Sequence, residues 1–200
     1  MKLYYVPGVC ARASHIALAE SGLKYEIEAL DVKTKKTKDG RDFWKLNPKG
    51  YVPALELDNK EVLTEGVAIM QWVADQAPDK HLLPKVGTWD RYRGVEWLNY
   101  IATEIHKGFS PLWNKDLPAS YREVVVANLS KKFDYLTEQL RGKEWIMGKT
   151  FTVCDGYLFT TLSWTKVLNI DMSKWPTLMG YVEKIGSRPA VKAVLQIESK

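Results

Sequence analysis

The chain has 200 residues and a formal net charge of +5, and its basic residues are spread along it, which argues against a nucleic-acid-binding protein. Its two cysteines lie far apart in the sequence, so we expect no structural disulfide and a reducing, cytoplasmic compartment. The start of the chain lacks the apolar core of a signal peptide, and no apolar run approaches the ~20 residues that span a membrane. We therefore predict a cytoplasmic protein with no membrane or nucleic-acid partner.

Residues 1–77 alternate between strand and helix patterns. We expect a strand over residues 2–6, a helix over 11–21, a strand over 25–30 and a short helix near residue 43. A hairpin of residues 52–57 and 60–63 and a helix over 66–77 follow. Gly22 is placed to end the first helix as its C-cap, and the polar, lysine-rich residues 31–42 predict a loop. This order predicts a thioredoxin-like domain, in which an antiparallel edge extends a parallel pair of strands.

Pro78 ends the last of these helices, and residues 78–88 predict a linker because they contain two prolines and a glycine. Beyond the linker the patterns are helical, over residues 89–107, 120–140, 152–168, 175–185 and 190–198. The predicted fold class is therefore α/β followed by all-α. A thioredoxin-like domain occupies residues 1–77, and an all-helical domain occupies residues 89–200.

Residues 151–155 predict the start of one of the later helices. Thr152 can cap this helix while Asp155, three positions on, reaches back to the Thr152 N–H, and Phe151 precedes the cap as a hydrophobic staple. Such a cap is worth ~0.5–2 kcal/mol and gives no reason to expect catalysis there. Cys154 lies in the same turn among apolar residues, so we expect its thiol to be neutral and in the core.

Cys10 is the strongest candidate for chemistry. It follows the first strand and the Pro7-Gly8 turn, and it opens the first helix. A thiol at the first turn of a helix lies where backbone N–H groups and the helix dipole favour the thiolate, and Arg12 would act in the same direction. Ala13 stands where a dithiol motif needs its second cysteine, so the pattern favours a single nucleophilic thiol. The alternative is a small buried apolar residue, as most free cysteines are.

Five blocks of sequence occur in order along the chain. They are residues 1–5 with Pro7-Gly-Val-Cys10; Asn47-Pro-Lys-Gly50 leading to Val52-Pro-Ala-Leu55; residues 63–69; residues 96–109; and residues 151–159. Together they resemble the glutathione transferases over the full length of the chain, and specifically the bacterial beta class. The resemblance implies a detoxifying enzyme that uses glutathione as co-substrate, holds no metal and forms a homodimer.

The resemblance also implies a glutathione site in the first domain. A cis peptide before Pro53 would let the N–H and C=O of Val52 pair with the cysteinyl part of glutathione. Backbone N–H groups at Glu65 and Gly66, at a helix start, would bind the γ-glutamyl carboxylate, and the Glu65 side chain would pair with the ammonium group. Gly66 replaces a serine that many relatives carry. In the basic loop, which composition alone predicts to be a solvated patch, Lys35 would bind the glycyl carboxylate.

Residues of the helical domain complete the implied site. His106 would face Cys10 across the interdomain cleft and polarise a sulfur atom, so these two are the predicted catalytic residues. Asn99 and Thr103 share a helix face with His106 at regular helical spacing. By resemblance both contact glutathione, as does Glu104, which would be supplied by the partner subunit of the homodimer.

Trp113 and Trp164 are candidates for an apolar pocket that holds a small hydrophobic electrophile, and a core role is the alternative. Tyr51 stands where a polar residue is commoner in the family, and it would crowd or stack on the cleft. Four residues are given no catalytic role: His15 and His81, expected to be structural or exposed, and Tyr4 and Tyr5, within the first strand.

The leading hypothesis is a transferase that conjugates the glutathione thiolate to small hydrophobic electrophiles. A second hypothesis is a glutathione-dependent disulfide reductase, in which Cys10 forms a mixed disulfide that another glutathione resolves. A third is a non-catalytic ligand-binding protein on the same fold, against which the joint presence of Cys10, Lys35 and His106 argues. Dehalogenation or isomerisation of one metabolite is a narrower enzymatic alternative.

Overall fold

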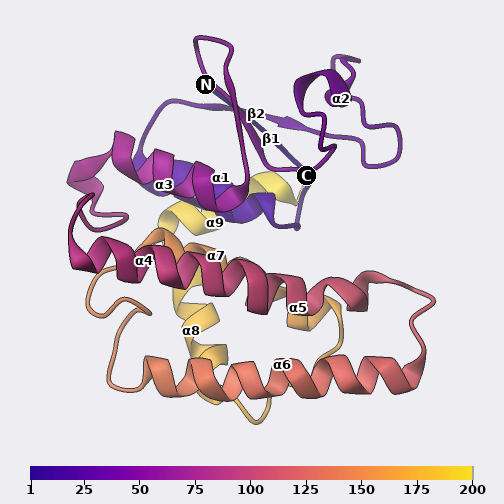
Figure 1. Cartoon of the computed structure of the whole chain (residues 1–200), viewed down its shortest axis with the longest axis vertical. Helices are drawn as coiled ribbons and strands as arrows, with labels where there is room; N and C mark the ends of the chain where they lie inside the picture. The colour runs from indigo at the N-terminus through magenta and orange to yellow at the C-terminus, as the bar shows by residue number, and fades with distance from the viewer. Residues whose placement is uncertain (200) are drawn as a thin grey trace. The chain divides into compact units, whose positions relative to one another are not determined.

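The computed structural model describes residues 1–199, which form two compact units (Figure 1). The first unit comprises Met1–Leu83 together with the C-terminal segment that begins at Pro189, and the second comprises Pro84–Arg188. The change from the first unit to the second falls inside the predicted linker. The C-terminal segment is predicted to belong to the helical domain, but it belongs to the first unit.

The first unit is built on a four-stranded mixed sheet with the order β2-β1-β3-β4. Its strands are β1 (Lys2–Tyr5), β2 (Glu26–Ala29), β3 (Ala54–Glu56) and β4 (Val62–Thr64). Strand β1 pairs parallel with β2 and antiparallel with β3, and β3 pairs antiparallel with β4. The predicted thioredoxin-like arrangement, with an antiparallel edge on a parallel pair, is therefore confirmed.

Helices α1 (Ala11–Ser21), α2 (Phe43–Leu46), α3 (Gly66–Gln76) and α9 (Pro189–Glu198) and the 3-10 turn η1 (Pro78–Lys80) complete the unit. Side chains of β1 alternate between the two faces of the sheet. Tyr5 meets His15 of α1 on one face, and Tyr4 meets Phe43 of α2 on the other. Gly22 ends α1 in the left-handed region, at φ 70°, as the sequence predicted.

Helix α9 packs against α1, and Figure 1 shows the yellow ribbon of α9 beside it. Its apolar face is fully buried at Val191 and Val194. Periodicity in the sequence predicts that a helix has such a face, but not which part of the chain covers it. The sequence therefore predicts the C-terminal helix but not that it packs against α1 of the first unit.

The second unit is helical. It contains α4 (Trp89–Tyr100), a π-helical segment η2 (Ile101–His106), α5 (Lys107–Phe109), the 3-10 turn η3 (Ser110–Trp113), α6 (Ala119–Leu140), α7 (Val153–Val167) and α8 (Pro176–Gly186). The helix predicted over residues 89–107 is thus interrupted by a π-helical segment. No helix within residues 1–199 is both long enough and apolar enough to cross a membrane.

The predicted capping box at the start of α7 is present. The Thr152 N–H donates to Oδ2 of Asp155 at 2.7 Å, and the Ile146 N–H donates to Oδ1 at 2.8 Å. The hydroxyl of Tyr181 donates to the same Oδ1. Asp155 is fully buried, so it joins α7, α8 and the preceding loop through one carboxylate. Cys154, in the same turn, is also fully buried, and burial raises its pKa, which confirms its predicted place in the core.

Candidate functional site

Cys10 directly precedes α1 and is half-buried, as expected for a thiol at a helix start. Its Sγ donates to the carbonyl oxygen of Val52 at 3.4 Å. Arg12, expected to favour the Cys10 thiolate, is paired through Nε with Oε2 of Glu198 at 2.8 Å. The thiol is therefore positioned by the helix start and by the segment at Val52, while the Arg12 charge is balanced by a carboxylate.

Glu198 contacts the Pro7-Gly8 turn that precedes Cys10, and no pattern in the sequence indicates this role. Its buried carboxylate accepts hydrogen bonds from the Gly8 N–H at 3.0 Å and from Arg12, and lies 3.1 Å from Nδ1 of His15. Burial opposes ionisation of this carboxylate, but the contacts with His15, Gly8 and Arg12 hold its pKa below the usual value. Helix α9 thereby holds the Pro7-Gly8 turn in front of Cys10. His15 is buried, which agrees with its expected structural role.

The Val52-Pro53 peptide is cis, as the resemblance implied. The neighbouring turn is fixed because Nδ2 of Asn47 donates to the carbonyl oxygen of Tyr51 at 2.7 Å. The Tyr51 side chain is 75% exposed. The segment formed by residues 50–53, which we call the cis-proline segment, thus presents its backbone beside Cys10.

Glu65 and Gly66 stand at the start of α3, where the first turn of a helix leaves backbone N–H groups without partners inside the helix. Glu65 has a positive φ of 68°, which is uncommon for a residue with a side chain. Its carboxylate lies 2.6 Å from Nζ of Lys49. A Cβ placed on Gly66 would lie 3.7 Å from Cγ of Pro53 and 3.8 Å from Oγ of Ser14, so the cis-proline segment also borders this helix start.

Lys35 is the second predicted glutathione residue with a positive φ, at 54°. Its N–H donates to the Asp31 carbonyl at 2.9 Å, and its carbonyl accepts from the Phe43 N–H at 2.9 Å. The ammonium donates to the carbonyl oxygen of Gly50, at the start of the cis-proline segment, at 3.1 Å. Unfavourable backbone conformations of this kind persist where the surrounding structure holds them, and they are concentrated at functional sites.

His106 ends the π-helical segment of the second unit. Its Nδ1 lies 2.8 Å from the hydroxyl of Tyr157, and its ring contacts that of Trp164 at a centroid distance of 5.0 Å. Burial, helped by the charge of Lys107, lowers the pKa of His106 to about 4. The imidazole is therefore neutral near pH 7, and only a neutral ring can accept a proton.

Asn99 and Thr103 are exposed and bind their own helix. Nδ2 of Asn99 donates to the Val95 carbonyl at 2.9 Å, and Oγ1 of Thr103 donates to the Asn99 carbonyl at 3.1 Å. Their expected shared face with His106 assumed regular α-helical spacing, whereas η2 is π-helical and has more residues per turn. Glu104 is paired with Lys132 at 2.8 Å within the same unit.

Trp113 and Trp164 contact each other with ring centroids 5.7 Å apart, but their environments differ. Trp164 is only 3% exposed and also packs on Phe109, so its surroundings fit the core alternative. Trp113 is 45% exposed and remains available to a ligand. Among residues 1–199, no group of three or more His, Cys, Asp and Glu side chains is placed to hold a metal ion.

Comparison with known protein families matches most of the chain to two domains of one family. Residues 1–75 match the family model described as the glutathione S-transferase N-terminal domain, and residues 100–189 match the corresponding C-terminal domain. The chain is 46% identical over 198 residues to glutathione S-transferase GstA of Escherichia coli O157:H7, an alignment that covers 99% of this chain and 98% of that protein.

Two solved structures are also closely similar. A sphingomonad glutathione S-transferase complexed with glutathione has a TM-score of 0.96 and 40% identity, over 100% of this chain and 99% of that one. The bacterial beta class glutathione S-transferase of Sphingomonas chungbukensis has a TM-score of 0.95 and 40% identity, over 99% of this chain and 98% of that one.

Proposed function

Because the chain belongs to the glutathione S-transferase family, with a beta-class member among its close structural relatives, we propose that it conjugates the thiolate of glutathione to small hydrophobic electrophiles. The observation that carries this proposal is the arrangement around the cis-proline segment. Cys10, Lys35 and the start of α3 at Gly66 all lie within contact distance of these four residues. The relative that is complexed with glutathione supports the same ligand.

The chemistry of glutathione matches this arrangement. The tripeptide has a carboxylate at each end, an ammonium group at one end and a thiol between them. In this proposal the Lys35 ammonium binds the glycyl carboxylate, the start of α3 binds the γ-glutamyl carboxylate, and Glu65 pairs with the ammonium group. The backbone of Val52 then pairs with the cysteinyl residue as a short added strand would.

In the proposed reaction, the bound glutathione loses its thiol proton and the thiolate attacks a carbon of the electrophile. A carbon–sulfur bond forms, and the leaving group departs with the bonding electrons. Donors held around the sulfur favour the thiolate, and one unit of pKa lowering corresponds to about 1.4 kcal/mol. The neutral imidazole of His106 can accept this proton, and by resemblance Asn99, Thr103 and Glu104 add glutathione contacts. We also propose that the enzyme is a homodimer, that it is cytoplasmic and that its role is detoxification.

A second candidate function rests on the position of Cys10. A half-buried thiol at a helix start can attack the glutathione sulfur of a glutathionylated substrate and release the substrate thiol. A second glutathione then attacks the mixed disulfide, restores the Cys10 thiol and leaves as oxidised glutathione. Cys154 is fully buried in α7, so this route uses one protein thiol.

Calorimetric titration with glutathione, together with initial rates on a chloronitrobenzene, tests the leading proposal. Replacement of Lys35 by Met should raise the KM for glutathione about tenfold, since one charge-assisted contact is lost, with kcat little changed. Lys33→Met in the same loop is the matched control. A wild-type protein that neither binds glutathione nor turns over would contradict the proposal and favour a non-catalytic binding protein.

Cys10→Ala separates the two catalytic candidates. Conjugation should persist in this variant if the glutathione sulfur is the nucleophile, whereas reduction of a glutathionylated peptide should be abolished. The intact mass after incubation with oxidised glutathione provides a direct readout. A single adduct that is removed by a reductant and absent from Cys10→Ala would favour the disulfide reductase.

A further inference from the structure

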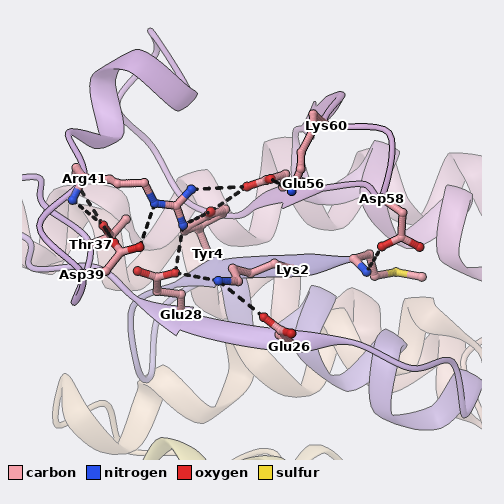
Figure 2. Close-up of polar contacts among 11 residues, drawn as sticks. Lys2, Tyr4, Glu26, Glu28, Thr37, Asp39, Arg41, Glu56, Asp58 and Lys60 are labelled. Atoms are coloured by element: carbon pink, nitrogen blue, oxygen red, sulfur yellow. Dashed lines mark hydrogen bonds and ion pairs between the residues drawn. The ribbon is translucent and has the colours of Figure 1, made fainter.

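One arginine joins three strands of the sheet in the first unit (Figure 2). Nη2 of Arg41 donates to the Tyr4 hydroxyl on β1 at 2.8 Å and to Oε2 of Glu28 on β2 at 3.2 Å. Nη1 of the same guanidinium lies 3.7 Å from Oε2 of Glu56 on β3. The planar guanidinium is suited to this geometry because its donors point in several fixed directions.

Arg41 also closes the loop that carries it. Its N–H donates to Oγ1 of Thr37 at 2.9 Å, while the Thr37 N–H donates to the Arg41 carbonyl at 3.0 Å. Its Nε donates to Oδ2 of Asp39 at 2.9 Å. Figure 2 shows Thr37 and Asp39 beside Arg41, with dashed lines to both. The backbone of residue 41 therefore closes the loop, while the guanidinium joins the loop to itself through Asp39 and to the sheet.

The closed loop leads directly to Lys35. Next to the paired residues Thr37 and Arg41, Lys36 and Asp42 form an isolated β-bridge, and the Lys35 carbonyl accepts from the Phe43 N–H. Lys35 itself has the positive φ that the surrounding hydrogen bonds must maintain. A continuous series of backbone contacts thus joins Arg41, which binds the sheet, to Lys35, whose ammonium binds the Gly50 carbonyl.

We propose that Arg41 is a positioning residue of the glutathione site, which holds the Lys35 ammonium where it binds the glycyl carboxylate. This inference rests on the proposed function. The alternative is that Arg41 only stabilises the sheet by compensating Glu28, whose side chain is 9% exposed. The two roles predict different kinetics. If Arg41 positions Lys35, its replacement weakens binding only of a substrate that has the glycyl carboxylate.

The test compares glutathione with γ-glutamylcysteine, which lacks the glycyl residue. Arg41→Met should raise the KM for glutathione about fivefold to tenfold, leave kcat nearly unchanged and leave the KM for γ-glutamylcysteine unchanged. In a Lys35→Met background, the same change should add less than twofold, because the contact it supports is already lost. Lys60→Met is the matched control, since Lys60 binds Glu56 at 3.1 Å but belongs to a different loop.

Arg41→Lys keeps the charge but loses the planar geometry, and it serves if Arg41→Met does not fold. It should show a smaller rise in the same KM, again only with glutathione. Equal losses with both thiols, or fully multiplicative effects with Lys35→Met, would overturn the inference and leave Arg41 with a purely stabilising role. A wild-type enzyme that does not distinguish the two thiols would contradict the assignment of Lys35 first, and with it the inference.

Discussion

In the first unit, the predicted glutathione residues lie around one backbone segment, whereas in the second unit the predicted side chains bind several different partners within that unit. Cys10 and Lys35 contact carbonyl groups of the cis-proline segment. By contrast, His106 binds Tyr157, and Thr103 binds its own helix. The comparison teaches that one backbone segment brings the first-unit residues together, whereas the second-unit residues are held by different partners within their own unit.

The largest expected effect concerns the second unit alone. Replacement of Asp155 by Ala leaves the Thr152 and Ile146 N–H groups and the Tyr181 hydroxyl buried without their acceptor, which should cost about 3 kcal/mol or more of unfolding free energy. Urea denaturation measures the loss. Asp171→Ala is the control, because Asp171 accepts similar local bonds from Ser173 in an exposed turn. A change below about 0.5 kcal/mol would show that the capping box is dispensable.

Glu198→Gln should produce the next largest effect, in the first unit. The loss of a buried carboxylate that accepts from Gly8 and Arg12 should cost about 2 kcal/mol. Because the pKa of Glu198 is lowered in the folded protein, its contribution is present above the unfolded value of about 4.5 and is lost as the pH falls through the folded pKa. The variant should therefore lose part of the acid sensitivity of wild type in melts at pH 3–7. The exposed Glu183→Gln should match wild type throughout.

His106 provides a test of pH dependence in the second unit. Its pKa is about 4 in the folded protein and near 6.5 when unfolded, so the unfolded state binds a proton first as the pH falls. Stability should therefore decrease between pH 6.5 and 4, by about 1–3 kcal/mol, with partial exposure favouring the lower figure. Denaturation of wild type and His106→Gln at pH 7 and 4.5 measures this difference. His81→Gln, which changes an exposed histidine, should lose stability as wild type does. If the loss persisted in His106→Gln, the prediction for His106 would be wrong.

Gly66→Ser should have the smallest effect and the opposite sign. The added Cβ makes only ordinary contacts with Pro53 and Ser14, so the unfolding free energy should change by less than about 0.5 kcal/mol. The new hydroxyl lies beside the helix start assigned to the γ-glutamyl carboxylate, and one added hydrogen bond to that carboxylate should tighten glutathione binding by at least about twofold to fivefold. Titration calorimetry checks this, with Gly66→Ala as the control that adds the Cβ but no hydroxyl. Weaker binding in both variants would show that Gly66 is required for space.

The features that could be predicted from the sequence are mostly local. The helix after Cys10, the C-cap at Gly22 and the capping box of Thr152 and Asp155 involve residues only a few positions apart. The cis peptide at Pro53 followed from the resemblance, and the structure confirms it.

The features that were missed depend on distant parts of the chain or on irregular helix geometry. Glu198 meets Gly8 across 190 positions, and Arg41 joins residues of three different strands. No pattern within a short window contains such partners. The π-helical turns of η2 also change the alignment of His106 with Thr103, and helical periodicity alone gives no sign of this.

The return of helix α9 to the first unit has a consequence for synthesis on the ribosome. Residues 1–83 leave the ribosome before the residues of α9 have been translated, so the nascent unit lacks the carboxylate that holds its Pro7-Gly8 turn. The intervening helical unit has to emerge first. The Pro7-Gly8 turn is therefore held by Glu198 only after α9 has been translated, and a nascent chain stalled before Pro189 would lack this contact.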